Sequence, residues 1–212
     1  MAFSFRDVEH NLCIALDNQT PSLLCPGEEC GANAVICYGY VDKFAGLTFE
    51  VLCLASYIDG DYTIVNENKS VGMKVRSETY KDIDVFPIKN AAIAKRFEDR
   101  IQLIEDNYYS NDAAEKAREM TCIDNFRHPF FPDDVLAVLV AQGLKAEQIW
   151  VRLLRYVMDL QGTDLFEGSL LNQPFDSNFN VGYGDKVYVA VKNDADGERC
   201  LVVPKHLISG DL

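Results

Sequence analysis

Residues 126–134 read FRHPFFPDD, and this segment most constrains how the chain can fold. Pro129 and Pro132 lack the backbone N–H that a helix interior or a central strand requires. The residue before each proline is also biased towards an extended conformation. We therefore expect an extended link here, with one domain over residues 1–126 and a second over residues 127–212.

The N-terminal part begins with a pattern that predicts β-strands. Short apolar runs typical of strands occur at residues 12–17, 34–41, 47–58, 61–67 and 82–88. Asp59-Gly60 separates two of these runs and is a strong hairpin signal. Pro87 cannot donate a ladder hydrogen bond, so the last run is expected at a sheet edge.

Two helices are expected next, over residues 90–108 and roughly 111–121. Apolar residues from Ile93 to Tyr108 recur at helical spacing, and Asn90 is a good N-cap. After the link, strand-like runs separated by Gly, Asn and Asp occur at residues 135–141, 147–158, 165–172, 185–191 and 199–204. The predicted class is α+β, with an N-terminal antiparallel sheet carrying two helices and a C-terminal small antiparallel β barrel or sandwich.

The chain is acidic, which restricts its partners. It has 20 Lys and Arg against 33 Asp and Glu, a formal net charge of −13. Residues 1–126 carry 12 basic and 21 acidic groups, and residues 127–212 carry 8 and 12, so neither part is basic. Nucleic acids and anionic membranes attract positive surfaces, so neither is expected as a partner, whereas a basic protein is.

The cysteine content and the N-terminus indicate the compartment. The chain has seven cysteines, an odd number. Its first residues contain no basic segment followed by an apolar run, and no apolar stretch approaches the length that spans a bilayer. These features favour reduced thiols and a cytoplasmic location.

The residue spacings favour a protein without metal, cofactor or catalytic group. Cys25 and Cys30 are five apart, whereas structural zinc sites usually pair tighter C-x-x-C knuckles. Cys122, Asp124 and His128 have the residue types of a thiol hydrolase. However, Cys122 falls at the C-terminal end of a predicted helix, where the helix dipole disfavours a thiolate. We assign no catalytic residue and no metal ligand.

An ordered pattern runs through the C-terminal part. A glutamate stands shortly before Trp-Val, then comes G-x-L-x-N-x-P, and a Gly-Asp precedes an apolar strand. The residues concerned are Glu147, Trp150, Val151, Gly168, Leu170, Asn172, Pro174, Gly184, Asp185 and Val187. With this pattern, residues from about 120 to 212 resemble the bacterial YegJ-like domains of unknown function. Many of those domains end in Ile-x-Asp-Trp, which this chain lacks, and its first 120 residues resemble no family.

The resemblance implies a small, mostly β domain, and some relatives are proposed as immunity proteins of bacterial toxin systems. We therefore expect a cytoplasmic bacterial protein that binds another protein without catalysis, of an immunity type suited to a basic toxin. The alternative is an enzyme or small-ligand binder with a pocket between the two domains.

The binding candidates are Trp150, Asn172 and Asp185, and each also suits a structural role. Asn172 fits a strand end, and Gly168, Gly184 and Asp185 fit turns. Trp150 lies in a run that is apolar on both faces, so we expect it to be mostly buried and structural.

Overall fold

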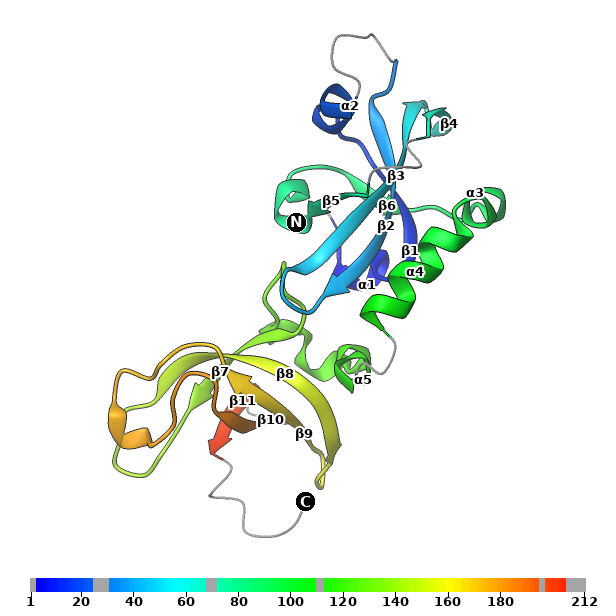
Figure 1. The fold of residues 1–212 in the computed structure, drawn as a ribbon. Helices are drawn as coiled ribbons and strands as arrows, with labels where there is room; N and C mark the ends of the chain where they lie inside the picture. Colours follow the sequence, from blue (N-terminus) through cyan, green and yellow to red (C-terminus); the bar gives the residue numbers. More distant parts are fainter. Residues whose placement is uncertain (1–2, 25–30, 68–71, 110–112, 195–196, 205–212) are drawn as a thin grey trace. The chain divides into compact units, whose positions relative to one another are not determined.

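The computed structural model describes residues 3–24, 31–67, 72–109, 113–194 and 197–204. The chain divides into two compact units, Met1–Ser110 and Asn111–Leu212 (Figure 1). The helix α5 (Ala113–Glu119) and the 3-10 helix η2 (Thr121–Phe126) precede the proline-containing segment and belong to the second unit. The division therefore lies before these helices, whereas the sequence placed it after residue 126.

The first unit is an antiparallel sheet with helices on both faces. Its elements are α1 (Phe5–Val8), β1 (Asn11–Ala15), α2 (Gln19–Leu24), β2 (Ala34–Asp42), β3 (Gly46–Ile58), β4 (Asp61–Asn66), β5 (Met73–Arg76), the 3-10 helix η1 (Ser77–Tyr80), β6 (Val85–Pro87), α3 (Ala91–Arg96) and α4 (Glu98–Tyr108). The strand order is β4-β3-β2-β1-β6, and β5 also pairs with β3. One face is covered by α3 and α4, and the other by α1, α2 and η1.

Two local features confirm the sequence expectations for this sheet. The turn between β3 and β4 is Asp59-Gly60, with φ angles of 51° and 96°. Two consecutive positive φ angles are typical of the type I′ hairpin turn. The edge strand is β6, in which Pro87 lies opposite Cys13. The N–H that Pro87 lacks is therefore not needed by a further strand.

The helix expected over residues 90–108 is two helices. Asn90 caps α3, since its Oδ1 accepts hydrogen bonds from the N–H groups of Ala92 and Ile93, each at 3.1 Å. Helical geometry is interrupted at Phe97, where φ is −111° and ψ is 17°. Phe97 is buried in the same apolar cluster as Ile93 and Ile104. The apolar spacing continues across the break, so periodicity predicted the buried face but not the interruption.

The second unit is a closed five-stranded barrel, which confirms the expected α+β class. Its elements after η2 are β7 (Asp134–Leu139), β8 (Glu147–Asp159), β9 (Thr163–Leu170), the 3-10 helix η3 (Ser177–Phe179), β10 (Lys186–Asp194) and β11 (Gly197–Pro204). The strand order around the barrel is β10-β11-β7-β8-β9. Four of the pairings are antiparallel, and the fifth, between β11 and β7, is parallel.

Alternate residues of the strands fill the barrel interior. This is the two-residue period of a strand with one buried face. The interior residues are Val135, Ala137, Leu139, Ile149, Val151, Leu153, Phe166, Leu170, Val187, Val189, Val191, Cys200 and Val202. Ala117 of α5 and Ile123 of η2 pack against the same cluster, so these two helices share the core of the barrel.

A buried ion pair also holds α5 to the barrel. The guanidinium of Arg118 donates to both carboxylate oxygens of Asp133, at 2.7 and 2.8 Å. The two side chains are only 3 % and 9 % exposed. Arg127 adds a hydrogen bond from its guanidinium to the carbonyl oxygen of Ala117, at 2.7 Å. These contacts explain why the chain divides before α5.

We expect Arg118→Ala to lower the free energy of unfolding by about 3–5 kcal/mol, because Asp133 would stay buried without its cation. The control is Arg155→Ala. Arg155 is 46 % exposed, and its partner Glu167 also pairs with Lys186, so its loss should cost about 1 kcal/mol or less. Urea denaturation of both variants measures the difference. Equal losses of unfolding free energy in the two variants would contradict the role of the Arg118–Asp133 pair in holding α5 to the barrel.

Candidate functional site

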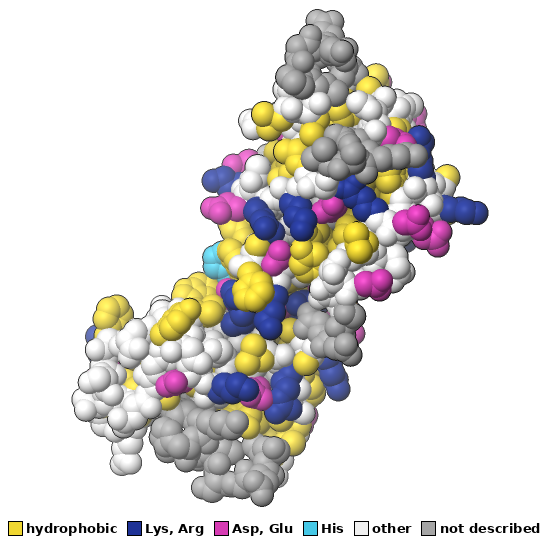
Figure 2. Space-filling model, viewed as in Figure 1, with side chains coloured by type: hydrophobic (Ala, Val, Ile, Leu, Met, Phe, Trp, Pro, Cys, Tyr) yellow, Lys and Arg dark blue, Asp and Glu magenta, His cyan; other side chains and the backbone are white. Residues whose placement is uncertain are grey.

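Charged and hydrophobic side chains are interspersed on the surface of both units, on the face shown in Figure 2. Single exposed apolar residues are ordinary in folded proteins and do not mark a site. A site assignment therefore needs a cavity, or a set of side chains in a defined arrangement.

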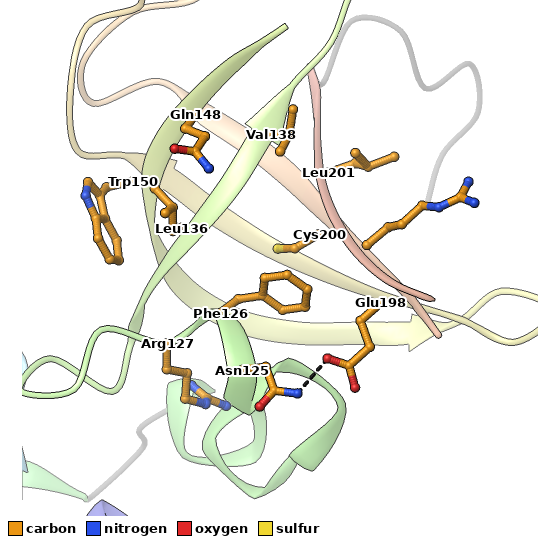
Figure 3. A pocket seen from close by; sticks show the side chains of 11 residues that line it. Asn125, Phe126, Arg127, Leu136, Val138, Gln148, Trp150, Glu198, Cys200 and Leu201 are labelled. Atoms are coloured by element: carbon orange, nitrogen blue, oxygen red, sulfur yellow. Dashed lines mark hydrogen bonds between the residues drawn. The ribbon is translucent and has the colours of Figure 1, made fainter. Parts of the chain in front are cut away.

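A pocket of about 370 Å³ opens in the second unit where β7 and β11 separate (Figure 3). The two strands pair at only two positions. Beyond that pairing, η2 and the residue after it lie between them. Arg127 bridges to Val135 of β7, and the Nδ2 of Asn125 donates to the Oε2 of Glu198 on β11 at 2.6 Å. The pocket is the space that remains beside this insertion.

Outward-facing apolar residues line much of the pocket. Because Val135, Ala137 and Leu139 point into the barrel, Leu136 and Val138 point out of it. The β7–β8 register places Leu136 beside Trp150 and Val138 beside Gln148. The apolar lining is Phe126, Leu136, Val138, Trp150, Cys200 and Leu201, and the polar lining is Asn125, Arg127, Gln148, Glu198 and Arg199. An apolar surface with a few polar groups at its edge is typical of binding sites.

Trp150 is partly buried and lies on the outer face of the barrel. Its neighbours Ile149 and Val151 take the interior positions, at 1 % and 0 % exposure. The indole packs edge-on against the ring of His128, with 5.2 Å between centroids. Trp150 is thus mostly buried, as expected from the sequence, and the part of the ring that stays accessible lies beside the pocket. Tryptophan in this setting is a frequent source of binding energy.

The other two candidates from the sequence do not line the pocket. The Oδ1 of Asn172 accepts a hydrogen bond from the backbone N–H of Trp150 at 2.8 Å. The Oδ2 of Asp185 accepts one from the N–H of Gly182 at 2.8 Å. Both side chains hold backbone in place, so only Trp150 of the three lies at the pocket.

Several residues of the C-terminal sequence pattern fasten one loop, which we call the β9–β10 loop (residues 171–185). The carboxylate of Glu147 accepts hydrogen bonds from the N–H groups of Phe175 and Asp176, at 2.7 and 2.9 Å. Gly184 has a φ of 84°, which confirms the expected turn. In this chain, these residues of the pattern are therefore explained by their role in shaping and attaching the β9–β10 loop.

Gly168 lies in β9 opposite Leu153, and the turn suggested for it by the sequence is wrong. A Cβ at this position would lie 2.5 Å from the Cγ1 of Val151 and 2.9 Å from the carbonyl oxygen of Arg152. Glycine is needed here because β8 and β9 approach too closely for any side chain.

The thiols near the pocket are poor nucleophiles. Cys200 is 3 % exposed, and burial, with a smaller effect of Cys122, raises its pKa to about 12. Burial and a hydrogen bond to Asp164 raise the pKa of Cys122 to about 12 as well. Both groups are therefore protonated at neutral pH and lack the thiolate that nucleophilic catalysis requires.

The residue types of a thiol hydrolase are not arranged as a catalytic triad. Asp124 forms a salt bridge with Arg127 at 3.0 Å. The thiol of Cys122 is hydrogen-bonded to Asp164 instead. Within the described ranges, no three His, Cys, Asp or Glu side chains are grouped to hold a metal ion. Cys25 and Cys30, considered as zinc ligands, lie outside those ranges.

Comparison of the chain with protein-family models, with curated proteins and with solved structures gives no match. The resemblance to YegJ-like domains therefore stays a prediction. Of the helices in the part of the chain that the structure describes, none has the length and apolarity needed to cross a bilayer.

Sequence reasoning missed most of the pocket. The clearest indication of the pocket in the sequence was the run from Val135 to Leu139 in β7, where apolar residues occupy both faces, as in a strand whose outer face is also covered. Nothing in the sequence places Phe126 or Leu201 beside β7, because their approach depends on which strands meet when the barrel closes.

The raised pKa values predict slow alkylation. We expect Cys13, Cys53 and Cys200 to resist iodoacetamide at pH 8 in the folded protein, because all three are buried and each has a pKa of about 12. In urea the same cysteines should react readily, which serves as the control. Peptide mass spectrometry distinguishes the sites. Rapid labelling of Cys200 in the folded state would show a reactive thiol at the pocket and contradict this account.

Proposed function

We propose that this chain is a non-enzymatic binding protein whose second unit captures an apolar side chain of a basic partner protein. The observation that carries the proposal is the partly buried Trp150 on the wall of an apolar pocket. A pocket of about 370 Å³ has room for a large side chain, and apolar contact there supplies affinity.

The charge of the chain supports a basic partner. With a net charge of −13, it attracts cationic proteins over long distances and repels acidic ones. Together with the resemblance described above, this favours an immunity-type role in the cytoplasm, in which the chain neutralises a basic bacterial toxin. The high pKa values of Cys122 and Cys200 support binding over thiol catalysis.

The test uses Trp150, the only tryptophan, as its own reporter. The probe is a short tryptophan-free peptide with one leucine between lysines, and its counterpart has glutamates in place of the lysines. We expect the lysine peptide to shift the Trp150 emission to shorter wavelength with saturation, because leucine binding removes water from the ring. The glutamate peptide should bind at least about tenfold more weakly, because like charges repel.

A matched pair of variants localises the binding. Leu136→Asn makes the pocket lining polar, whereas Leu160→Asn makes the same change at an exposed position in the β8–β9 turn. The first should abolish the emission shift and the second should leave it intact. If the lysine peptide causes no shift at millimolar concentration, or if both variants behave alike, the proposal fails.

A small-ligand binder is the second candidate function, and the pocket volume favours it. The pocket that carries this candidate lies within the second unit. Binding of 1-anilinonaphthalene-8-sulfonate in a one-to-one ratio, lost in Leu136→Asn, together with no response to the lysine peptide, would favour this candidate over protein binding.

A further inference from the structure

The β9–β10 loop displays two aromatic side chains to solvent. Phe175 is 98 % exposed and Tyr183 is 73 % exposed. Aromatic residues contribute disproportionately to protein–protein binding energy, because they offer a large contact area with few rotatable bonds. Neither Phe175 nor Tyr183 lines the pocket, so the pocket does not explain their exposure.

Hydrogen bonds attach this loop to the rest of the second unit. Besides the bonds from Glu147, the Oε1 of Gln173 accepts from the N–H of Tyr183 at 3.2 Å, and the N–H of Gly184 donates to the carbonyl oxygen of Leu170 at 2.9 Å. The backbone of both exposed aromatics is thus fixed by a side chain of the same unit. A fixed loop loses little conformational entropy on binding, so its contacts yield more affinity.

The loop is also negatively charged. Residues 171–185 include Asp176 and Asp185 and contain no lysine or arginine, and Glu147 adds a third carboxylate beneath them. Two nearby cations pair with other carboxylates, Arg152 with Asp134 at 2.7 Å and Lys186 with Glu167 at 3.4 Å. Aromatic faces among carboxylates suit cationic side chains, which gain from both the charge and the ring.

The loop is continuous with the pocket wall. The N–H of Leu171 donates to the carbonyl oxygen of Trp150 at 2.9 Å, and Asn172 accepts from the N–H of Trp150. The start of the loop is therefore hydrogen-bonded to the residue that borders the pocket.

We propose that the β9–β10 loop is a preformed docking surface for arginine and lysine side chains of a basic protein, with Phe175 and Tyr183 as the contact residues. The inference rests on the proposed function and deepens it, since it identifies a second contact for the same partner and the chemistry that this contact recognises.

The probe is a fluorescein-labelled nona-arginine peptide, which has no apolar side chain for the pocket. Its dissociation constant is measured by anisotropy at low salt for the full chain and for the double variant Phe175→Ser with Tyr183→Ser. The matched control is Phe44→Ser, which removes a side chain that is 82 % exposed in the first unit. All three proteins have the same net charge, so general electrostatic attraction is equal among them.

We expect the double variant to bind the peptide about tenfold more weakly, because two cation–π contacts are lost, and Phe44→Ser to match the unmodified chain. Equal affinity for the double variant and the unmodified chain would overturn the inference, as would an equal loss in Phe44→Ser. If that happens while the lysine–leucine peptide still shifts the Trp150 emission, only the loop inference fails. If neither peptide binds the unmodified chain, the proposed function fails and the loop inference fails with it.

Discussion

The parallel pairing of β11 with β7 closes the barrel, and the features of the second unit on which the proposed binding rests follow from it. A ring of five strands cannot alternate in direction all the way round, so at least one neighbouring pair must be parallel. Here that pair has only two positions, Leu201 opposite Val138 and Val202 opposite Leu139. Since the strands then separate, η2 inserts beside them and leaves the pocket that Trp150 borders.

Polar side chains hold the β9–β10 loop and the backbone of Trp150, while two aromatic side chains of this loop remain exposed. Glu147, Asn172 and Asp185 each accept backbone N–H groups, and so fix the β9–β10 loop and the backbone of Trp150. Satisfying backbone donors in this way lets a loop hold a shape without a core of its own. The loop can then keep Phe175 exposed, because its conformation does not depend on burying that ring.

The elements that local chemistry controls could be predicted from the sequence. Asp59-Gly60 indicated its hairpin, Pro87 indicated an edge strand, and the spacing from Ile93 to Tyr108 indicated a buried helical face. These signals act within a few residues, so the sequence displays them directly.

The features that depend on distant parts of the chain could not be predicted. The attachment of α5 depends on Arg118 reaching Asp133, and the need for glycine at position 168 comes from the approach of β8. The pocket is lined by residues of η2, β7, β8 and β11, and the strand order of the barrel brings these elements together. Trp150 was a candidate from the sequence, but its place at a pocket emerged only from the closed barrel.

Amide hydrogen exchange by NMR tests most directly whether the second unit presents a preformed surface for the proposed binding. The N–H groups of Phe175, Asp176 and Tyr183 are hydrogen-bonded to Glu147 and Gln173, although their loop lies at the surface. We predict that these amides exchange about a hundredfold more slowly than in an unstructured peptide, and that Glu147→Ala removes the protection of the Phe175 and Asp176 amides. Exchange at unstructured rates in the unmodified chain would show that the loop is not held in place, and would contradict the account.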